Sequence, residues 1–269
     1  MAKKERIDKL LVERGLAESR EKAQALVMAG LVYADGRRVS KPGEKVSTEA
    51  RLEVRGRMRF VSRGGYKLEK ALRDFGIAPE GFVCLDAGAS TGGFTDCLLQ
   101  KGARKVYAVD VGTGQLDYRL RSDPRVTSYE RTDARNLTEK EVPEKVDLVT
   151  VDVSFIPVEK VIPNLTRFLK EGGLMLVLVK PQFELSPKDV KKGVVRSEEK
   201  RREAVQKVAR FATELGLSVL GVTKSAPKGP KGNEEFFLLL RKDGKGTLPP
   251  DWEEKLERAL KEEVPKEVV

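Results

Sequence analysis

The chain has 269 residues, enough to bury one large core and to carry a small extra domain. It contains no histidine, which excludes Ser-His and Cys-His nucleophilic sites and every His-ligated metal site. The net charge is +10, and +8 of it lies in residues 1–70, where 18 Lys and Arg face 10 Asp and Glu. A basic first quarter joined to a nearly balanced body indicates a module that binds a polyanion.

The expected compartment follows from the cysteines and the apolar runs. Cys84 and Cys97 are too few for a structural zinc site and fall within apolar patterns, so we expect buried thiols in a reducing cytosol. We identify no signal peptide, and the longest apolar run, residues 174–179, is far shorter than a membrane span. We therefore expect a soluble, cytoplasmic and monomeric protein without a metal ion.

The start of the chain predicts two short helices followed by a small ribbon of strands. Apolar residues recur at helical spacing, the first helix ends at Gly15, and the second begins after Ser19 as N-cap and ends at Gly30. Alternating residues then surround an Asp35-Gly36 pair, which is typical of a hairpin turn. The unit is therefore a small α+β domain.

The basic residues of this unit avoid the apolar stripes. The order of elements and the pattern RxDKLLVERGLAxSRxKAQxLVxAG over residues 5–56 resemble the RNA-binding domain named after the fourth small-subunit ribosomal protein, the S-four domain. The resemblance implies binding of structured RNA by shape and backbone charge. The alternative is a domain that serves only for packing. A basic link, residues 55–65, follows this unit and contains the last two of the candidate RNA contacts. The candidates are Lys9, Arg14, Arg20, Lys22, Arg37, Arg38, Arg57 and Arg63.

A glycine-rich turn dominates the remainder. Residues 82–94, FVCLDAGASTGGF, predict a buried strand ending in Asp86, a loop that approaches a ligand closely, and a helix from Thr95 onward. The next strand ends in Asp110, placed to accept hydrogen bonds from ribose hydroxyls, and a third ends near Asp133, a partner for an adenine amino group. The candidate cofactor contacts are Asp86, Gly88, Ser90, Gly92, Gly93, Phe94, Asp110 and Asp133.

The loop D-x-G-x-x-x-G-G differs from the dinucleotide pattern G-x-G-x-x-G, and the acid ahead of it disfavours a phosphate. S-adenosylmethionine has an amino group, a sulfonium and a ribose but no phosphate, so we expect it as the cofactor. A dinucleotide and a purely structural turn are the alternatives.

Further strands and helices alternate down the chain, which predicts a parallel, doubly wound sheet. Two of these strands end in Asp152 and Lys180, a helix between them is expected to close on Gly172 and Gly173, and residues 185–200 are expected to form a mobile loop over the crevice. The last strand follows a tight turn, so we expect it to be antiparallel. The predicted fold is an α/β, Rossmann-like, seven-stranded methyltransferase sheet. The predicted domains are residues 1–59, residues 60–245 and a C-terminal helix within residues 246–269, packed on the body.

Four residues far apart in sequence are expected to meet over the cofactor: Lys67, Asp152, Lys180 and Glu235. With VDVSF, LVKPQFE and GNEEFF around them, they resemble the site of the FtsJ-like RNA 2′-O-methyltransferases. With the RNA-binding module, the chain resembles the TlyA family of rRNA cytidine 2′-O-methyltransferases, which also carry the label hemolysin. The resemblance covers residues 5–245 and implies that Lys180 takes the proton of a ribose hydroxyl, assisted by the other three.

Alternatives remain at this stage. Each of the four residues taken singly could be structural, and the adjacent Glu234 could replace Glu235. Methylation of a base nitrogen would favour an N/D-P-P-Y/F turn, which DVSF lacks, and methylation of carbon would need a cysteine at a strand end. A non-catalytic RNA-binding assembly factor is the main competing function. A pore former would need a membrane-inserting segment that the sequence does not contain.

Overall fold

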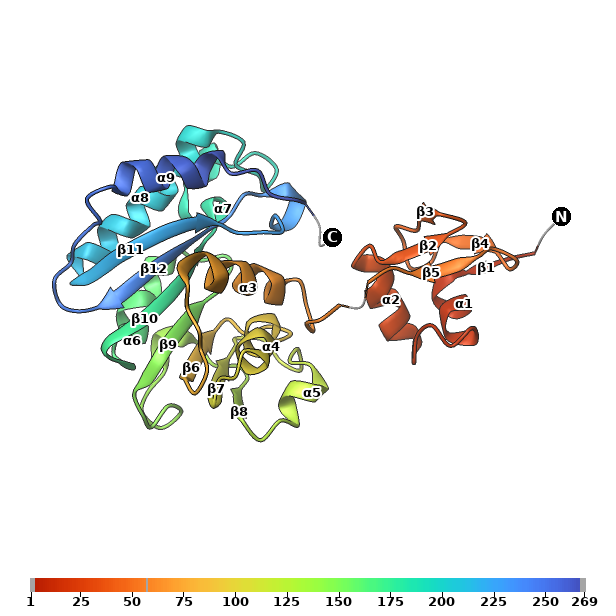
Figure 1. Cartoon of the computed structure of the whole chain (residues 1–269), viewed down its shortest axis with the longest axis horizontal. Helices are drawn as coiled ribbons and strands as arrows, with labels where there is room; N and C mark the ends of the chain where they lie inside the picture. Colours follow the sequence, from red (N-terminus) through yellow and green to blue (C-terminus); the bar gives the residue numbers. More distant parts are fainter. Residues whose placement is uncertain (1–2, 57, 267–269) are drawn as a thin grey trace. The chain divides into compact units, whose positions relative to one another are not determined.

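The computed structural model describes residues 3–56 and 58–266 (Figure 1). They form two compact units, one up to Arg59 and one from Phe60 to Lys266. Each unit has a hydrophobic core of its own, so each is described by itself.

The first unit packs two helices against short strands. Ser19 caps the second helix by accepting the Lys22 amide, as the sequence predicts. The Asp35-Gly36 turn is confirmed, with both residues at positive φ, 49° and 77°. Two small antiparallel sheets have the orders β1-β4 and β3-β2-β5. The elements are β1 Lys4–Arg6, α1 Ile7–Glu13, α2 Arg20–Met28, β2 Val32–Ala34, β3 Arg37–Arg38, β4 Lys45–Ser47 and β5 Leu52–Val54.

The second unit is built on one seven-stranded sheet with the order β11-β12-β10-β9-β6-β7-β8. β12 pairs antiparallel with both β10 and β11, while the pairs from β10 to β8 are parallel. This confirms the Rossmann-like sheet with its last strand antiparallel. The strands are β6 Val83–Ala87, β7 Lys105–Val109, β8 Val126–Tyr129, β9 Val146–Val151, β10 Leu169–Val179, β11 Leu217–Lys224 and β12 Phe236–Lys242.

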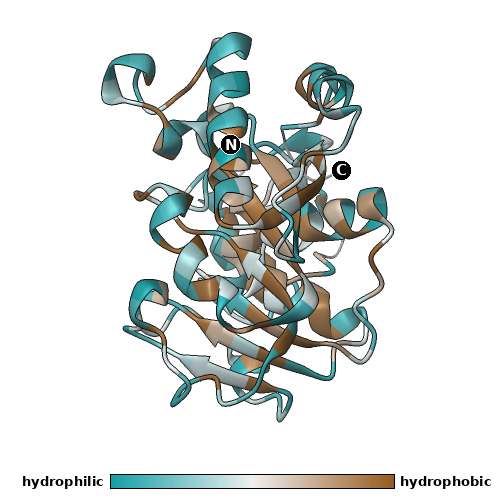
Figure 2. Ribbon diagram, turned by 90° about the vertical axis from the view of Figure 1, so that its left-hand side faces the viewer, coloured by the Kyte–Doolittle hydropathy of each residue, from teal (hydrophilic) through white to brown (hydrophobic). Residues whose placement is uncertain are grey.

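Helices cover both faces of this sheet. Along β10, alternate residues belong to two separate clusters: Val177 packs with α6, α8 and α9, whereas Leu176 and Leu178 pack with α3, α4 and α5. Figure 2 shows the apolar strands lying between helices with hydrophilic outer surfaces. The helices are α3 Gly64–Phe75, α4 Gly93–Gln100, α5 Tyr118–Arg121, α6 Ile162–Thr166, α7 Pro181–Glu184, α8 Glu198–Glu214 and α9 Trp252–Lys261, with short 3₁₀ turns η1 Ala134–Asn136, η2 Val158–Lys160, η3 Pro187–Asp189 and η4 Pro230–Gly232.

The tail helix expected after residue 250 is α9, and its Trp252, Leu256 and Leu260 are buried in the second unit. The prediction of one long helix that ends at Gly172 and Gly173 is wrong. Only η2 and the one-turn α6 form there, and the chain enters β10 at Leu169, before the glycines. Pro163 explains the break between η2 and α6, because a proline inside a continuous helix would remove a hydrogen bond and clash with the preceding turn.

Candidate active site at the strand ends

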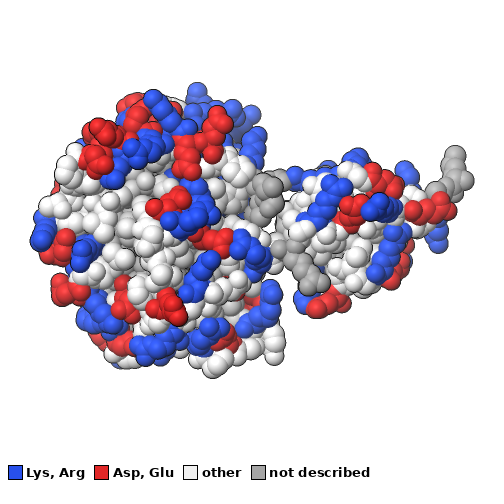
Figure 3. All heavy atoms as spheres, viewed as in Figure 1, with Lys and Arg blue, Asp and Glu red and all other residues white. Residues whose placement is uncertain are grey.

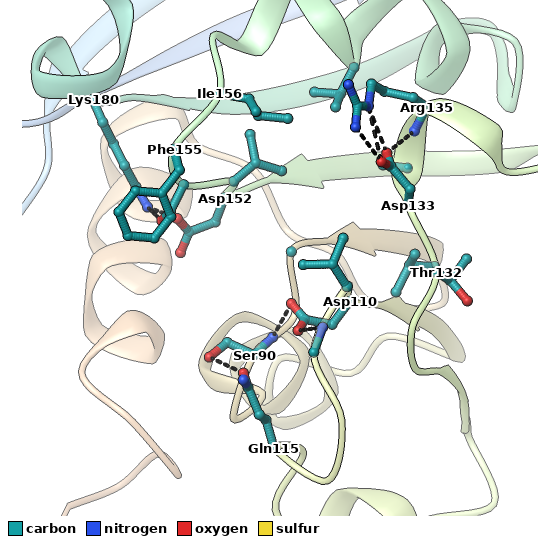
Figure 4. Close-up of a pocket in the computed structure, with 18 residues that line it drawn as sticks. Ser90, Asp110, Gln115, Thr132, Asp133, Arg135, Asp152, Phe155, Ile156 and Lys180 are labelled. Atoms are coloured by element: carbon teal, nitrogen blue, oxygen red, sulfur yellow. Dashed lines mark hydrogen bonds and ion pairs between the residues drawn. The ribbon is translucent and has the colours of Figure 1, made fainter. Parts of the chain in front are cut away.

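A pocket of about 480 Å³ opens at the carboxyl ends of four neighbouring strands (Figure 4). Gly88 follows β6, Asp110 follows β7, Asp152 follows β9 and Lys180 follows β10, and all four line the pocket. Ligands of parallel α/β sheets bind at this edge. The convergence of strand ends that the sequence predicts is therefore present.

The loop after β6 requires glycine for two reasons. Gly88 has φ +82°, and a Cβ there would lie 2.0 Å from the carbonyl oxygen of Asp152. Gly92 has φ +102°, and its Cβ would lie 2.2 Å from Leu120. Both the backbone conformation and the close packing exclude a side chain. The loop therefore lies directly against the segment that carries Asp152.

Asp86 lies behind this loop, outside the pocket lining. Its carboxylate is fully buried and accepts the hydroxyls of Thr95 and Thr150, at 2.7 and 3.1 Å. Burial raises the pKa of Asp86 to about 7, against the opposing effect of the two hydroxyls. Asp86 thus holds β6, β9 and the start of α4 together, and the structure gives it no surface toward a ligand.

Three other expected cofactor contacts also lie outside the lining residues of the pocket. Gly92 and Gly93 are buried at the start of α4, where Gly93 packs against Ser62 and Gly65. The Phe94 ring packs on Phe237 with centroids 5.8 Å apart. These three residues support the loop from outside the pocket.

Ser90, Asp110 and Asp133 do line the pocket. The two Asp110 carboxylate oxygens accept the amides of Ser90 and Gly112, at 3.1 and 2.9 Å. A carboxylate has about four acceptor positions, so Asp110 can accept further donors. Asp133 is held by Arg135, whose Nη2 lies 2.6 Å away, and this hydrogen bond is the main reason why the pKa of Asp133 is lowered.

The four proposed catalytic residues form two ion pairs. Lys180 Nζ lies 2.5 Å from Asp152 Oδ1 and donates to Ser154 Oγ at 3.1 Å. Lys67 Nζ lies 2.9 Å from Oε1 of Glu235, which is fully buried. Figure 4 shows the first pair at the pocket wall, whereas Lys67 and Glu235 are not among the lining residues.

The choice between the two adjacent glutamates has a geometric answer. Glu235 contacts Lys67, while Glu234 is paired with Arg201, Lys224 and Lys228. Successive residues near a strand point to opposite sides, so only one of them can face α3. In the structure, Glu235 occupies the position expected beside Lys67.

Comparison with known proteins identifies the family of the chain. Residues 60–242 match the FtsJ-like methyltransferase family, and a relative from Mycobacterium tuberculosis named 16S/23S rRNA (cytidine-2′-O)-methyltransferase TlyA is 48% identical over 90% of this chain and 91% of its own length. The chain belongs to the TlyA family of FtsJ-like methyltransferases. Residues 5–52 match the S4 domain, the S-four domain of the sequence analysis.

Two further relatives carry a different name. Hemolysin A of Brachyspira hyodysenteriae is 41% identical over 86% of this chain and 98% of its own length. The solved structure of a hemolysin-named protein from Streptococcus thermophilus is 42% identical, covers 96% of each chain and has a TM-score of 0.75. Within residues 3–56 and 58–266, every helix is too short or too polar to cross a membrane.

Sequence reasoning missed an aromatic residue that lines the pocket, Phe155 (Figure 4). Phe155 is 85% exposed and has φ 67°, and its ring centroid lies 5.0 Å from that of Phe183. A bulky residue at positive φ is uncommon, and an aromatic ring that stays exposed contributes little hydrophobic stabilisation to the fold. The motif VDVSF contains Phe155, but neither its exposure nor its backbone conformation can be read from a sequence.

In the S4 domain, the candidate RNA contacts fall into two groups. Arg14 and Arg20 have structural partners: Arg14 donates to the carbonyls of Thr48 and Ala50, and Arg20 donates to the fully buried Asp8 at 3.1 Å. Like Arg14 and Arg20, the other four are exposed: Lys9 pairs with Glu5 and Glu13, Lys22 with Glu18, and Arg37 with Glu44, while Arg38 lies near Gly30.

The two candidates in the basic link have different outcomes. Arg57 lies outside the described residues. Arg63 donates to the carbonyls of Lys228 and Lys266, at 2.8 and 2.9 Å, and so ties the start of α3 to the segments that follow β11 and α9. Figure 3 shows Lys and Arg interspersed with Asp and Glu on the visible face of each unit.

Proposed function

We propose that this protein transfers a methyl group from S-adenosylmethionine to the ribose 2′-hydroxyl of a cytidine in ribosomal RNA, in the cytoplasm. The observation that carries the proposal is the Lys180–Asp152 pair at the wall of the strand-end pocket. The family and the printed name of the M. tuberculosis relative support the substrate.

The pocket fits the cofactor that the family implies. The backbone at Gly88 passes where no side chain fits, Asp110 retains acceptor capacity for ribose hydroxyls, and the volume of about 480 Å³ is in the range of small-ligand sites. Ser90 and the strand-end segments 109–112 and 132–135 complete the wall. When bound, S-adenosylmethionine supplies an electrophilic methyl group; the residues of the chain orient the acceptor and manage its proton.

The proton of the 2′-hydroxyl must leave as the oxygen attacks. In our proposal, Lys180 Nζ in its neutral form accepts that proton, so the O–H bond breaks as the O–CH₃ bond forms, and the cofactor would leave as the neutral thioether once its methyl–sulfur bond is broken. The resulting ammonium stays beside Asp152 and Ser154, which already contact Nζ. The pair of Lys67 and Glu235 is proposed to orient the hydroxyl and the base.

The exposed Phe155 ring is proposed to stack on a base of the RNA. Aromatic stacking on an unstacked base contributes about 1–3 kcal/mol and tolerates any base. Phe155 is two residues after Val153, which lines the same pocket as Lys180. A base held on this ring would keep its ribose near Lys180.

The proposed role of Lys180 is tested by Lys180→Ala, assayed for methyl transfer to ribosomal RNA. We expect transfer to fall at least a hundredfold, while calorimetry shows nearly unchanged S-adenosylmethionine affinity. Lys188→Ala, at an exposed position in η3 outside the pocket lining, is the control and should transfer normally. Transfer near the wild-type rate in the Lys180 variant would remove it as the base.

A further inference from the structure

The one-turn helix α7 follows Lys180 directly and contacts three different segments around the active site. Gln182 reaches Glu235 before β12, Phe183 packs on Phe155, and Glu184 reaches the backbone at Val158. No role in the chemistry proposed above is assigned to these side chains. All three side chains therefore extend from the turn of chain immediately after the proposed base.

Gln182 connects the Lys67–Glu235 pair to the turn of chain that follows Lys180. Its Nε2 donates to Glu235 Oε2 at 2.9 Å, and the other oxygen of the same carboxylate takes Lys67 Nζ at 2.9 Å. A Cβ on Gly229 would lie 2.6 Å from either carboxylate oxygen, so the loop packs against the Glu235 carboxylate with room for a glycine but for no side chain. The Lys67–Glu235 pair is therefore fixed to the same turn of chain that carries Lys180.

Glu184 fixes the segment of chain that follows Asp152. Its side chain is 1% exposed, and Oε1 accepts the amide of Val158 at 2.9 Å. Val158 ends the segment that begins at Asp152 and includes Phe155. The nearest cation, Lys207 Nζ, lies 3.9 Å from Oε2 and donates instead to the Glu184 carbonyl at 3.0 Å. The segment from Asp152 to Val158 is thus held at both ends, by Lys180 and by Glu184.

Packing alone does not account for polar side chains at these positions. In the described part of the chain, Gln182 Oε1 and Glu184 Oε2 are buried without a hydrogen-bond partner. Each such atom costs about 1–3 kcal/mol, a cost that an apolar side chain of similar size would avoid. The polar side chains provide two hydrogen bonds in return: Gln182 Nε2 donates to Glu235, and Glu184 Oε1 accepts the Val158 amide.

We propose that Gln182 and Glu184 are positioning residues that hold the two ion pairs in register for methyl transfer. The inference rests on the proposed function, because it concerns the geometry around Lys180. A displacement of about 1 Å at a reaction centre can lower the rate about a hundredfold. Loss of either contact should therefore reduce turnover more than substrate binding.

The test uses the full-length protein with ribosomal RNA and S-adenosylmethionine. Gln182→Met and Glu184→Met keep the size of each side chain and remove its hydrogen bonds, and we expect kcat to fall about tenfold to a hundredfold, with KM for RNA changed less than threefold. Glu184→Gln keeps an acceptor for the Val158 amide and should restore kcat to within threefold of the wild type. Gln100→Met and Glu203→Met, on exposed faces of α4 and α8, are matched controls.

A readout that does not depend on activity accompanies the kinetics. Hydrogen exchange followed by mass spectrometry should show faster exchange of residues 152–160 in Glu184→Met than in the wild type and Glu184→Gln. Unchanged exchange, or unchanged kcat in folded Gln182→Met, would overturn the positioning role. Absence of methylation by the wild-type protein, with the exchange difference present, would instead contradict the proposed function.

Discussion

At the scale of single residues, two buried carboxyls make the stability of the protein depend on pH. Burial raises the pKa values of Asp86 and Glu184 to about 7 each. A carboxyl whose folded-state pKa is raised contributes stability that is fully present below its unfolded-state pKa and is lost as pH rises through the folded-state pKa. Between about pH 4 and pH 7, these two groups therefore make the fold progressively less stable.

Asp86→Asn tests this dependence, because asparagine does not titrate and can still bond the two threonine hydroxyls. Relative to the wild type, the variant should gain stability between pH 4 and pH 7, at up to about 1.4 kcal/mol per pH unit, and no more above pH 8. Urea unfolding at pH 5 and pH 8 measures the difference. A stability difference that stays constant over this range would contradict the raised pKa of Asp86.

Phe155→Ala separates stacking from folding. Because the ring is 85% exposed, its removal should leave the free energy of unfolding nearly unchanged, and methyl transfer to RNA should fall about tenfold. Phe155→Tyr, which keeps a ring, should remain active. Tyr118→Ala removes another exposed ring, outside the pocket lining, and serves as the control in the same transfer assay. Equal transfer by Phe155→Ala and the wild type would exclude the stacking role.

At the scale of elements, the sequence was most informative about strand ends. The runs before Asp86, Asp110, Asp152 and Lys180 are apolar for several residues and then turn polar, which marks where a buried strand reaches the sheet edge. The two-residue turn at Asp35-Gly36 was predictable because few residues tolerate positive φ. These features depend only on local chemistry.

Other features depended on tertiary contacts that a sequence does not display. The direction of the Asp86 carboxylate, toward Thr95 and Thr150 instead of the pocket, is set by strand pairing and by the loop behind it. In the sequence, Gln182 is an ordinary polar residue. Its hydrogen bond to Glu235 forms only because the fold brings the end of β10 close to the segment before β12. The interruption of the helix expected before Gly172 could have been anticipated, because Pro163 is visible in the sequence.

Gly88→Ala tests the close approach of the glycine loop to the Asp152 segment. A Cβ there would overlap the Asp152 carbonyl oxygen and would also sit at positive φ, so we expect a loss of more than 2 kcal/mol in unfolding free energy and weaker S-adenosylmethionine binding. Gly114→Ala has a similar φ, +65°, and open space around it, so only about 1–2 kcal/mol should be lost. Urea titration compares the two, and equal losses would show that the contact adds nothing.

At the scale of the whole molecule, the first unit carries most of the charge excess and the second carries the chemistry. Residues 1–59 hold 15 Lys and Arg against 9 Asp and Glu, a net charge of +6 out of +10, whereas all proposed catalytic residues lie in the unit that begins at Phe60. We expect the S4 domain to supply RNA affinity. Because Arg20 neutralises the buried Asp8, the sharper test leaves it intact and changes exposed residues.

The triple variant Lys22→Gln, Arg37→Gln, Arg38→Gln should weaken RNA binding and flatten its salt dependence, since each lost phosphate contact lowers the slope by at most about one unit. Filter binding at several salt concentrations measures both effects. The matched control is Lys140→Gln, Lys145→Gln, Lys170→Gln, near the amino ends of β9 and β10, away from the pocket. A domain that serves only for packing would give both triples the affinity and slope of the wild type.

The atom that receives the methyl group distinguishes ribose methylation from methylation of a base. The most direct measurement incubates the purified protein with unmethylated ribosomal subunits and S-adenosylmethionine, digests the RNA to nucleosides, and identifies the new methylated nucleoside by mass spectrometry. We predict 2′-O-methylcytidine, formed by the wild type and absent with Lys180→Ala. Methylation on a base, or no methylated nucleoside in an experiment where the protein binds both RNA and S-adenosylmethionine, would contradict this prediction.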